Sequence, residues 1–375
     1  MNDAIQAITM PKWGLAMDEG TVVAWLAEEN SLIETGQEVV EIETTKITNV
    51  FEVPFGGPLR RRVAQEGETL PVGALLGLVA DAEVSEADLD AFIEAFNANF
   101  VQQAAEAEEA APEAQPIAAD GFELYHLRMG TPGAGAAPII LVHGFGGDLV
   151  SWLFNQPVLA QDHDVLALDL PGHGRAVKDL GEGGLPALTR ALAGYMDALE
   201  LDKAHLVGHS MGGAVAVNMA LQQPQRVSGL TLLAPAGMGP EINMDFIQGF
   251  CQAAKRKEMR AALEFLVANP ELISRDMINE SLKYKRLDGV TAALDRLSKD
   301  LFPDGRQLTF SDVDLAGLTV PMTVIWGEAD RILPITQAAH LPASAAVHRL
   351  PDVGHLPHME ATAEVNRLIL SSLEG

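Results

Sequence analysis

Residues 204–214 read Ala-His-Leu-Val-Gly-His-Ser-Met-Gly-Gly-Ala, an apolar strand pattern followed by Gly-x-Ser-x-Gly and the start of a helix. The glycines at 208 and 212 permit a tight turn that lifts the Ser210 hydroxyl clear of the backbone. A strand–turn–helix context of this kind is the one that a nucleophilic serine requires. The motif alone is a weak signal, so its interpretation depends on the rest of the chain.

Strand and helix patterns alternate from about Gly121 onward. Continuous apolar strands are expected at Pro138–Val142, Val165–Leu168, His205–Val207, Leu230–Leu233 and Met322–Ile325, with helices at Pro186–Leu199 and Met211–Gln223. Buried strands alternating with helices predict a parallel sheet covered on both faces, in a domain spanning residues 121–375. Residues 239–315 break the alternation, because they are helical in pattern and rich in charge. They are predicted to form a helical lid.

Two later motifs supply partners for Ser210. Asp330 ends a predicted strand and is the expected acid, and His355 near the C-terminus is the expected base. The oxyanion donors are expected to be the backbone N–H groups of Phe145, in the His-Gly-Phe-Gly-Gly loop after an early strand, and of Met211. The order Ser…Asp…His and these loops resemble the α/β-hydrolase family.

Several residues near these motifs have side chains that could serve in other roles. Glu328 is an alternative acid to Asp330. His173, His209 and His358 are interpreted as structural histidines rather than the base. No third ligand is obvious beside His355 and His358, and the chain has one cysteine, Cys251, so no metal site is predicted.

The first 80 residues have short strand patterns between glycines and no helical periodicity, which predicts a small all-β unit. Within it, Met10–Gly14, Glu19–Thr21, Glu41–Lys46 and Val53-Pro54 resemble the lipoyl domain of multienzyme dehydrogenase complexes, a flattened β-barrel or sandwich. The resemblance implies lipoate covalently bound at Lys46. The family usually has Asp where this chain has Thr45. Biotin domains carry Met on both sides of the lysine, so lipoate is favoured over biotin.

A helix and a linker are expected between these domains, over residues 81–120. Ser85 and Asp88 form a capping-box pattern, and apolar residues follow at helical spacing up to Phe100. This stripe either packs on a neighbouring domain or docks a partner subunit. Residues 101–120 are mostly Ala, Glu, Gln and Pro, a composition interpreted as a linker.

The combination of a lipoyl domain with an α/β-hydrolase domain resembles the dihydrolipoamide acetyltransferase component of acetoin dehydrogenase complexes. The resemblance implies acetyl transfer from the lipoyl arm to coenzyme A, through an acetyl-Ser210 intermediate. It also implies two partners, a thiamin-diphosphate-dependent acetoin-cleaving component and dihydrolipoamide dehydrogenase. Two alternatives stay open: a lipoyl-tethered thioesterase or hydrolase, and a non-enzymatic lipoyl carrier and scaffold.

The 375 residues carry 25 Lys+Arg against 52 Asp+Glu, a net charge of −27. Such an acidic chain disfavours nucleic-acid binding, and no apolar run approaches the ~18–20 residues that span a membrane. The single cysteine and an N-terminus without a secretory pattern make the cytoplasm the expected compartment. Lys255, Arg256 and Lys257 stand out as candidates for contacts with coenzyme A or with the lipoyl domain, against the alternative of a solvated helix face.

Overall fold

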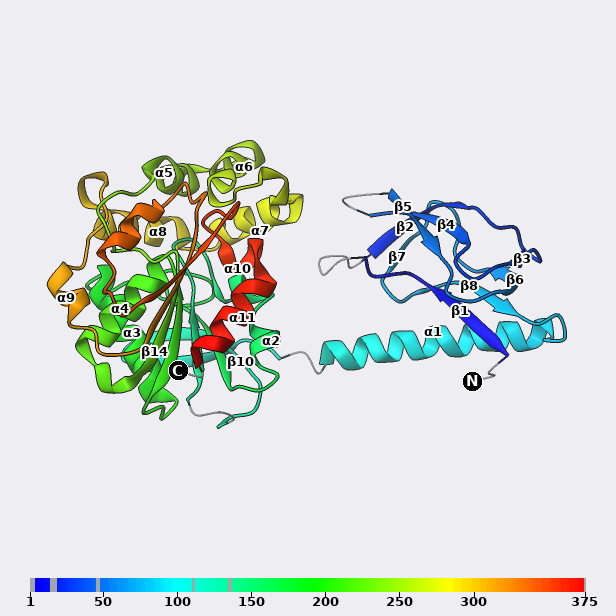
Figure 1. The fold of residues 1–375 in the computed structure, drawn as a ribbon, viewed down its shortest axis with the longest axis horizontal. Coiled ribbons are helices and arrows are strands. Elements are labelled where there is room, and N and C mark those ends of the chain that lie inside the picture. Colours follow the sequence, from blue (N-terminus) through cyan, green and yellow to red (C-terminus); the bar gives the residue numbers. More distant parts are fainter. Residues whose placement is uncertain (1–3, 14–18, 45–47, 110–111, 134–136, 374–375) are drawn as a thin grey trace. The chain divides into compact units, whose positions relative to one another are not determined.

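The computed structural model describes the chain apart from residues 1–3, 14–18, 45–47, 110–111, 134–136 and 374–375 (Figure 1). The chain divides into two compact units, residues 1–111 and 112–375. Within the described ranges, no helix combines the length and apolar character needed to cross a bilayer.

The first unit is built from two four-stranded antiparallel sheets. One sheet has the order β1 (Ile5–Thr9), β8 (Leu75–Ala80), β6 (Gly57–Arg62), β3 (Leu32–Ile33), and the other β5 (Thr48–Glu52), β4 (Glu38–Glu43), β2 (Glu19–Trp25), β7 (Thr69–Pro71). Apolar side chains of both sheets, among them Ile8, Val22 and Leu59, form one buried core. Gly20 is required in this core, since a Cβ there would lie 2.8 Å from both Ile42 Cγ2 and Met10 Sδ. The predicted small all-β sandwich is confirmed.

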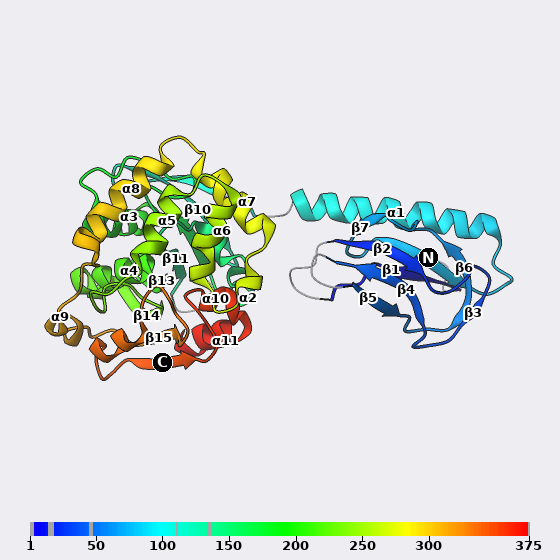
Figure 2. The same ribbon diagram turned by 90° about the horizontal axis from the view of Figure 1, so that it is seen from above.

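Helix α1 (Glu86–Glu109) follows these sheets and belongs to the first unit (Figures 1 and 2). Its N-terminus is capped as predicted, because the Asp88 backbone N–H donates to Ser85 Oγ. Leu89 is fully buried against strands β1 and β8, and Phe92, Ile93 and Phe96 pack beside it. The apolar stripe therefore covers the sheet of its own unit, which favours the packing interpretation over partner docking.

The linker predicted over residues 101–120 is wrong for most of its length. Helix α1 continues to Glu109, and Gln115–Ala119 forms strand β9 of the second unit. The Ala- and Glu-rich composition that was interpreted as a linker also has high helix propensity, so it extends the helix. Strand β9 pairs with β10 (Phe122–Met129) through a two-residue turn of Asp120 and Gly121, both with positive φ. Asp-Gly is a favoured sequence for this turn.

The second unit contains one eight-stranded mixed sheet. Its order is β16 (Ala346–Leu350), β15 (Met322–Gly327), β14 (Val227–Leu233), β13 (Ala204–His209), β11 (Ile139–Val142), β12 (Val165–Asp169), β10, β9. The strands from β11 to β16 are parallel, as predicted, while β9 and β10 are antiparallel at one edge.

Helices cover both faces of this sheet. Side chains of α3 (Gly184–Ala198) and α4 (Met211–Gln222) belong to one core, and those of α2 (Gln156–Leu159) and α11 (Thr362–Leu373) to another. Residues 239–315, expected to be helical, carry α5 (Met244–Gln252), α6 (Arg256–Leu263), α7 (Arg275–Lys285), α8 (Val290–Leu301) and α9 (Asp312–Ala316). Helices α5–α8 lie together at one end of the unit (Figure 1), and their apolar faces join the first of these cores.

Candidate active site

Ser210 occupies a sharp turn between β13 and α4. Its backbone has φ 51° and ψ −115°, a left-handed φ that is strained for a residue with a side chain. The strain is held by hydrogen bonds on both sides, because Ser210 N–H donates to the Leu233 carbonyl and the Ser210 carbonyl accepts from Ala236 N–H. The glycines of the motif are sterically required. A Cβ on Gly208 would lie 2.5 Å from the Gly212 carbonyl oxygen, and one on Gly212 would lie 2.2 Å from the Val142 oxygen.

The loop after β11 approaches the serine closely. A Cβ on Gly144 would lie 3.2 Å from Ser210 Cβ and 2.7 Å from His209 Nδ1, so only glycine allows this approach. Among the described residues, neither the Phe145 N–H nor the Met211 N–H has a hydrogen-bond acceptor. Phe145, Met211 and Ser210 line the same cavity. Two unpaired N–H groups beside a serine hydroxyl are the arrangement that stabilises an oxyanion.

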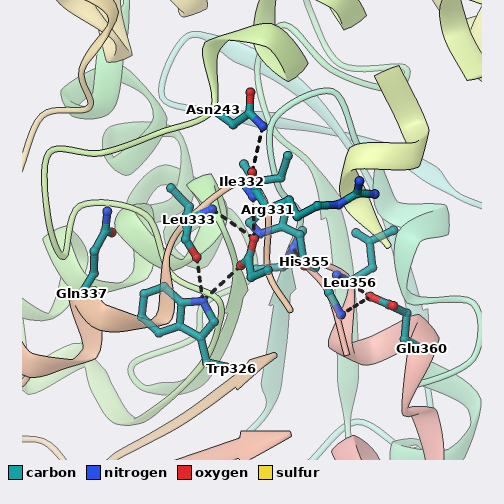
Figure 3. A network of polar contacts seen from close by, with 12 residues as sticks. Asn243, Trp326, Arg331, Ile332, Leu333, Gln337, His355, Leu356 and Glu360 are labelled. Atoms are coloured by element: carbon teal, nitrogen blue, oxygen red, sulfur yellow. Dashed lines mark hydrogen bonds and ion pairs between the residues drawn. The ribbon is translucent and has the colours of Figure 1, made fainter. Parts of the chain in front are cut away.

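A buried carboxylate–histidine pair lies behind this cavity. His355 Nδ1 is 2.8 Å from Asp330 Oδ2, and the two side chains are 2% and 0% exposed. Asp330 also accepts from Trp326 Nε1 and from the backbone N–H groups of Ile332 and Leu333 (Figure 3). These donors satisfy the carboxylate and fix its orientation. A His355 tautomer that donates Nδ1–H to Asp330 has Nε2 unprotonated and able to accept a proton.

Two side chains outside the predicted set hold the histidine loop. Glu360 accepts hydrogen bonds from Gly354 N–H and Leu356 N–H on either side of His355, and from Ala268 N–H of the insertion (Figure 3). His209 Nε2 donates to the His355 carbonyl oxygen over 2.8 Å.

The insertion is also joined to the acid loop. Asn243, which caps the start of α5, donates from its side chain to the Arg331 carbonyl and from its backbone to the Ile332 carbonyl (Figure 3). The insertion therefore forms hydrogen bonds with the loop that follows Asp330 and, through Ala268, with Glu360, which holds the loop around His355.

The cavity has a volume of about 560 Å³. Ser210 and His355 line it, together with apolar side chains from the insertion, including Phe246, Phe250 and Phe302. Its size is typical of a small-molecule site, and its largely apolar wall limits the number of water molecules near the serine.

The residues considered as alternatives have other environments. Glu328 is exposed, and it is Asp330 that contacts His355. Burial lowers the pKa of His173 and of His209 well below the ordinary value, and lowers that of His358 to about 3, so these histidines are neutral. Burial raises the pKa of the Cys251 thiol to about 11, so this thiol is a poor nucleophile.

The predicted cationic residues lie apart from the serine. Lys255, Arg256 and Lys257, at the start of α6, are exposed and line a second, open groove rather than the cavity that contains Ser210. Lys46 lies outside the described residues. The strands on either side of it in sequence, β4 and β5, are paired with Glu43 opposite Thr48.

Three features define this unit as an α/β hydrolase. They are a serine on a strand–helix turn, an Asp–His pair on later loops, and a helical insertion after a strand of a mixed sheet. The family model for the α/β hydrolase fold matches residues 137–362, and that for biotin-requiring enzymes matches residues 6–79. A solved 2-hydroxy-6-oxo-6-phenylhexa-2,4-dienoate hydrolase from Rhodococcus has a TM-score of 0.65 at 20% identity, covering 70% of this chain and 99% of its own. That likeness supports the fold alone.

Two named acetyltransferase components match this chain over almost its full length. The dihydrolipoyllysine-residue acetyltransferase component of the acetoin cleaving system of Pseudomonas putida is 44% identical over 98% of each chain. The corresponding component from Cupriavidus necator is 42% identical over 100% of this chain and 99% of its own. The chain belongs to this acetyltransferase family, and the predicted family and two-part architecture are confirmed. Membership, with the match of the first unit, supports a covalently bound lipoyl group.

Proposed function

We propose that this chain transfers the acetyl group of acetyl-dihydrolipoamide to coenzyme A, with Ser210 as the nucleophile. The observation that carries the proposal is the buried Asp330–His355 pair, which is aligned at 2.8 Å beside a cavity that Ser210 also lines. The relatives that match over the full length are named as acetyltransferase components of acetoin cleaving systems. The same family membership supports placing this chain beside a thiamin-diphosphate-dependent acetoin-cleaving component and dihydrolipoamide dehydrogenase.

In the first half-reaction, His355 Nε2 takes the proton of Ser210 as Oγ attacks the carbonyl carbon of the acetyl thioester. The N–H groups of Phe145 and Met211 stabilise the oxyanion, a contribution of roughly 3–4 kcal/mol per donor. Asp330 stabilises the imidazolium that forms. The C–S bond then breaks, His355 returns its proton to the departing sulfur, and Ser210 carries the acetyl group as an ester.

In the second half-reaction, His355 takes the thiol proton of coenzyme A, and the sulfur attacks the carbonyl carbon of acetyl-Ser210. The C–O bond breaks, and Ser210 Oγ regains the proton from His355. Both half-reactions exchange an ester and a thioester without a redox change, so one set of residues serves both. A thioesterase would use the same residues with water as acceptor. The apolar wall of the cavity favours the thiol because it limits access of water.

Lys46 is the proposed attachment site of the lipoyl group. When attached, this group supplies the dithiol that carries acetyl as a thioester. The paired strands β4 and β5 fit a lysine attachment site between them, because Glu43 and Thr48 face each other on either side of the Lys46 segment.

An assay with free acetyl-dihydrolipoamide tests this function. The full chain should form acetyl-CoA when coenzyme A is present and release little acetate when it is absent. The Ser210→Ala variant should lose several orders of magnitude in rate while keeping its circular dichroism spectrum. Near-native acetyl-CoA formation by this variant would exclude the serine mechanism, and acetate release unaffected by coenzyme A would indicate a thioesterase.

A further inference from the structure

Helix α7 separates the serine cavity from the second groove. Met277, Ser281 and Tyr284 of this helix line the cavity, whereas Asp276, Asn279 and the C-cap residue Arg286 line the groove. Glu280 and Lys283 line both. The two hollows therefore adjoin at Glu280 and Lys283 of α7.

Cationic side chains dominate this groove. Five exposed cations line it. Three come from α6 and its N-cap and two from α7 and its C-cap, and they are Lys255, Arg256, Lys257, Lys283 and Arg286. Two carboxylates, Asp276 and Glu280, also line it, and Lys283 is paired with Glu280 at 2.5 Å. The other four cations have no ion pair within the described part of the chain. A local excess of unpaired cations is unusual on a chain whose net charge is −27.

Local structure does not account for these cations. The backbone N–H groups of Ala254 and Lys255 at the start of α6 donate to Glu258 Oε2, so this carboxylate caps the helix and does not pair with the cations. Lys285, the last residue of α7, differs from the cations of the groove in where its ammonium group lies. Its ammonium group turns inward and donates to the carbonyls of Phe250, Cys251 and Ala253, where it caps α5. Lys285 has a structural task, whereas the cations of the groove face outward into an open hollow.

We propose that this groove binds the phosphate groups of coenzyme A, while the thiol arm passes along the edge of α7 to Ser210. The inference rests on the function proposed above. Lysine and arginine side chains are the usual protein partners of phosphate, and the groups to be bound are multiply charged. The apolar cavity suits the uncharged arm, and the cationic groove suits the nucleotide end. Each hollow thus matches one part of the acceptor.

Binding tests the site independently of turnover. The Ser210→Ala chain provides the background, and Lys255, Arg256 and Lys257 are changed together to glutamine. A matched control changes Lys203, Lys299 and Arg349 to glutamine, three exposed cations that line neither hollow. Calorimetric titration with coenzyme A should show an affinity at least roughly tenfold weaker for the groove variant and unchanged for the control. Equal affinity in both would overturn the proposal, even if the serine mechanism were correct.

Kinetics on the chain with Ser210 intact separate the phosphate contacts from other roles. With free acetyl-dihydrolipoamide as donor, the groove variant should have a raised KM for coenzyme A, a near-native kcat, and an unchanged kcat/KM for pantetheine, which lacks the nucleotide. Raising the salt concentration should raise the KM of the unmodified chain more than that of the variant. A loss seen only with the chain's lipoyl unit as donor would assign the groove to protein docking and reject coenzyme A. A failure of all acetyl transfer with retained binding would reject the proposed function but keep the site.

Discussion

Single residues determine the geometry of the serine turn, and Gly212 is the clearest case. An alanine Cβ at 212 would lie within 2.5 Å of backbone oxygens of both Val142 and His143, neither of which can move without breaking the central sheet. Gly212→Ala should therefore destabilise the second unit by several kcal/mol and remove activity. Gly249→Ala, inside helix α5, is the matched control, since its Cβ would make an ordinary 3.7 Å contact with Ala262 Cβ. That substitution should stabilise the chain by about 0.5–1 kcal/mol. Urea denaturation of both variants measures the difference, and equal stabilities would contradict the steric argument.

Buried histidines make the stability of the second unit depend on pH. Burial, and secondarily the charge of His355, lowers the pKa of His358 to about 3 from an ordinary value of 6.5. The unfolded chain therefore binds a proton that the folded chain excludes, so stability falls as pH drops below 6.5. The slope is up to about 1.4 kcal/mol per pH unit for each such histidine.

The variant His358→Leu should reduce this slope. Comparing free energies of unfolding at pH 8 gives the packing effect of the substitution, because the histidine is neutral in both states there. The difference between variant and unmodified chain should then shift in favour of the variant at pH 5. Urea unfolding read from peptides of the second unit, by pulsed hydrogen exchange at a fixed labelling pH, gives the measurement. Parallel pH profiles for the two proteins would refute the assignment.

The sequence was informative about site residues that belong to local motifs. Ser210 and Asp330 each follow a predicted strand, and His355 was predicted from its Gly-His motif near the C-terminus. The structure brings Asp330 and His355 into contact and Ser210 to the same cavity. Trp326 and Glu360 were not predicted. Trp326 lies only four residues before Asp330, but an apolar strand residue carries no sign that its indole N–H will donate to the carboxylate. The role of Glu360 depends partly on a tertiary contact. Glu360 bonds Ala268, which lies 92 residues away along the chain. No local pattern marks such a contact.

At the scale of elements, helix α1 gives a test of what its apolar stripe does. Leu89→Ala removes a fully buried side chain from the contact with β8, and should cost the first unit about 2–5 kcal/mol. Val101→Ala on the same helix is the control, because Val101 is 66% exposed and its loss should change stability by less than about 0.5 kcal/mol. Thermal unfolding of the full chains compares them. If Leu89→Ala kept full stability but lost binding to the acetoin-cleaving component, the stripe would be a docking surface instead.

Elements were predicted well where burial imposes a pattern and poorly where it does not. The central strands β11, β12 and β13 are buried on both faces, so they read as continuous apolar runs. Strand β9 lies at the sheet edge and mixes exposed with buried residues, so its pattern was hidden in a linker-like composition. The Asp120-Gly121 turn was the signal that could have revealed the β9–β10 hairpin.

At the scale of the whole molecule, the proposed function assigns carriage of the acetyl group to the first unit and its transfer to the second. Substitution of Lys46 tests this division. Lys46→Arg keeps the charge but removes the amine that lipoate requires. The variant should therefore show no flux from acetoin to acetyl-CoA in the reconstituted system. It should still transfer acetyl from free acetyl-dihydrolipoamide at a near-native rate, because Ser210, Asp330 and His355 belong to the other unit.

Lys12→Arg is the matched control for this experiment, since Lys12 is an exposed lysine of the same unit. The Lys12→Arg variant should retain activity in both assays. Intact-mass measurement should find the lipoyl group on the Lys12→Arg variant but not on the Lys46→Arg variant. Flux that survives in Lys46→Arg would place the carrier function at another lysine. Loss of transfer from the free donor as well would mean that the two units depend on each other for catalysis. The expected result, loss in one assay only, follows because tethering raises the effective concentration of the acetyl donor without altering the chemistry at the serine.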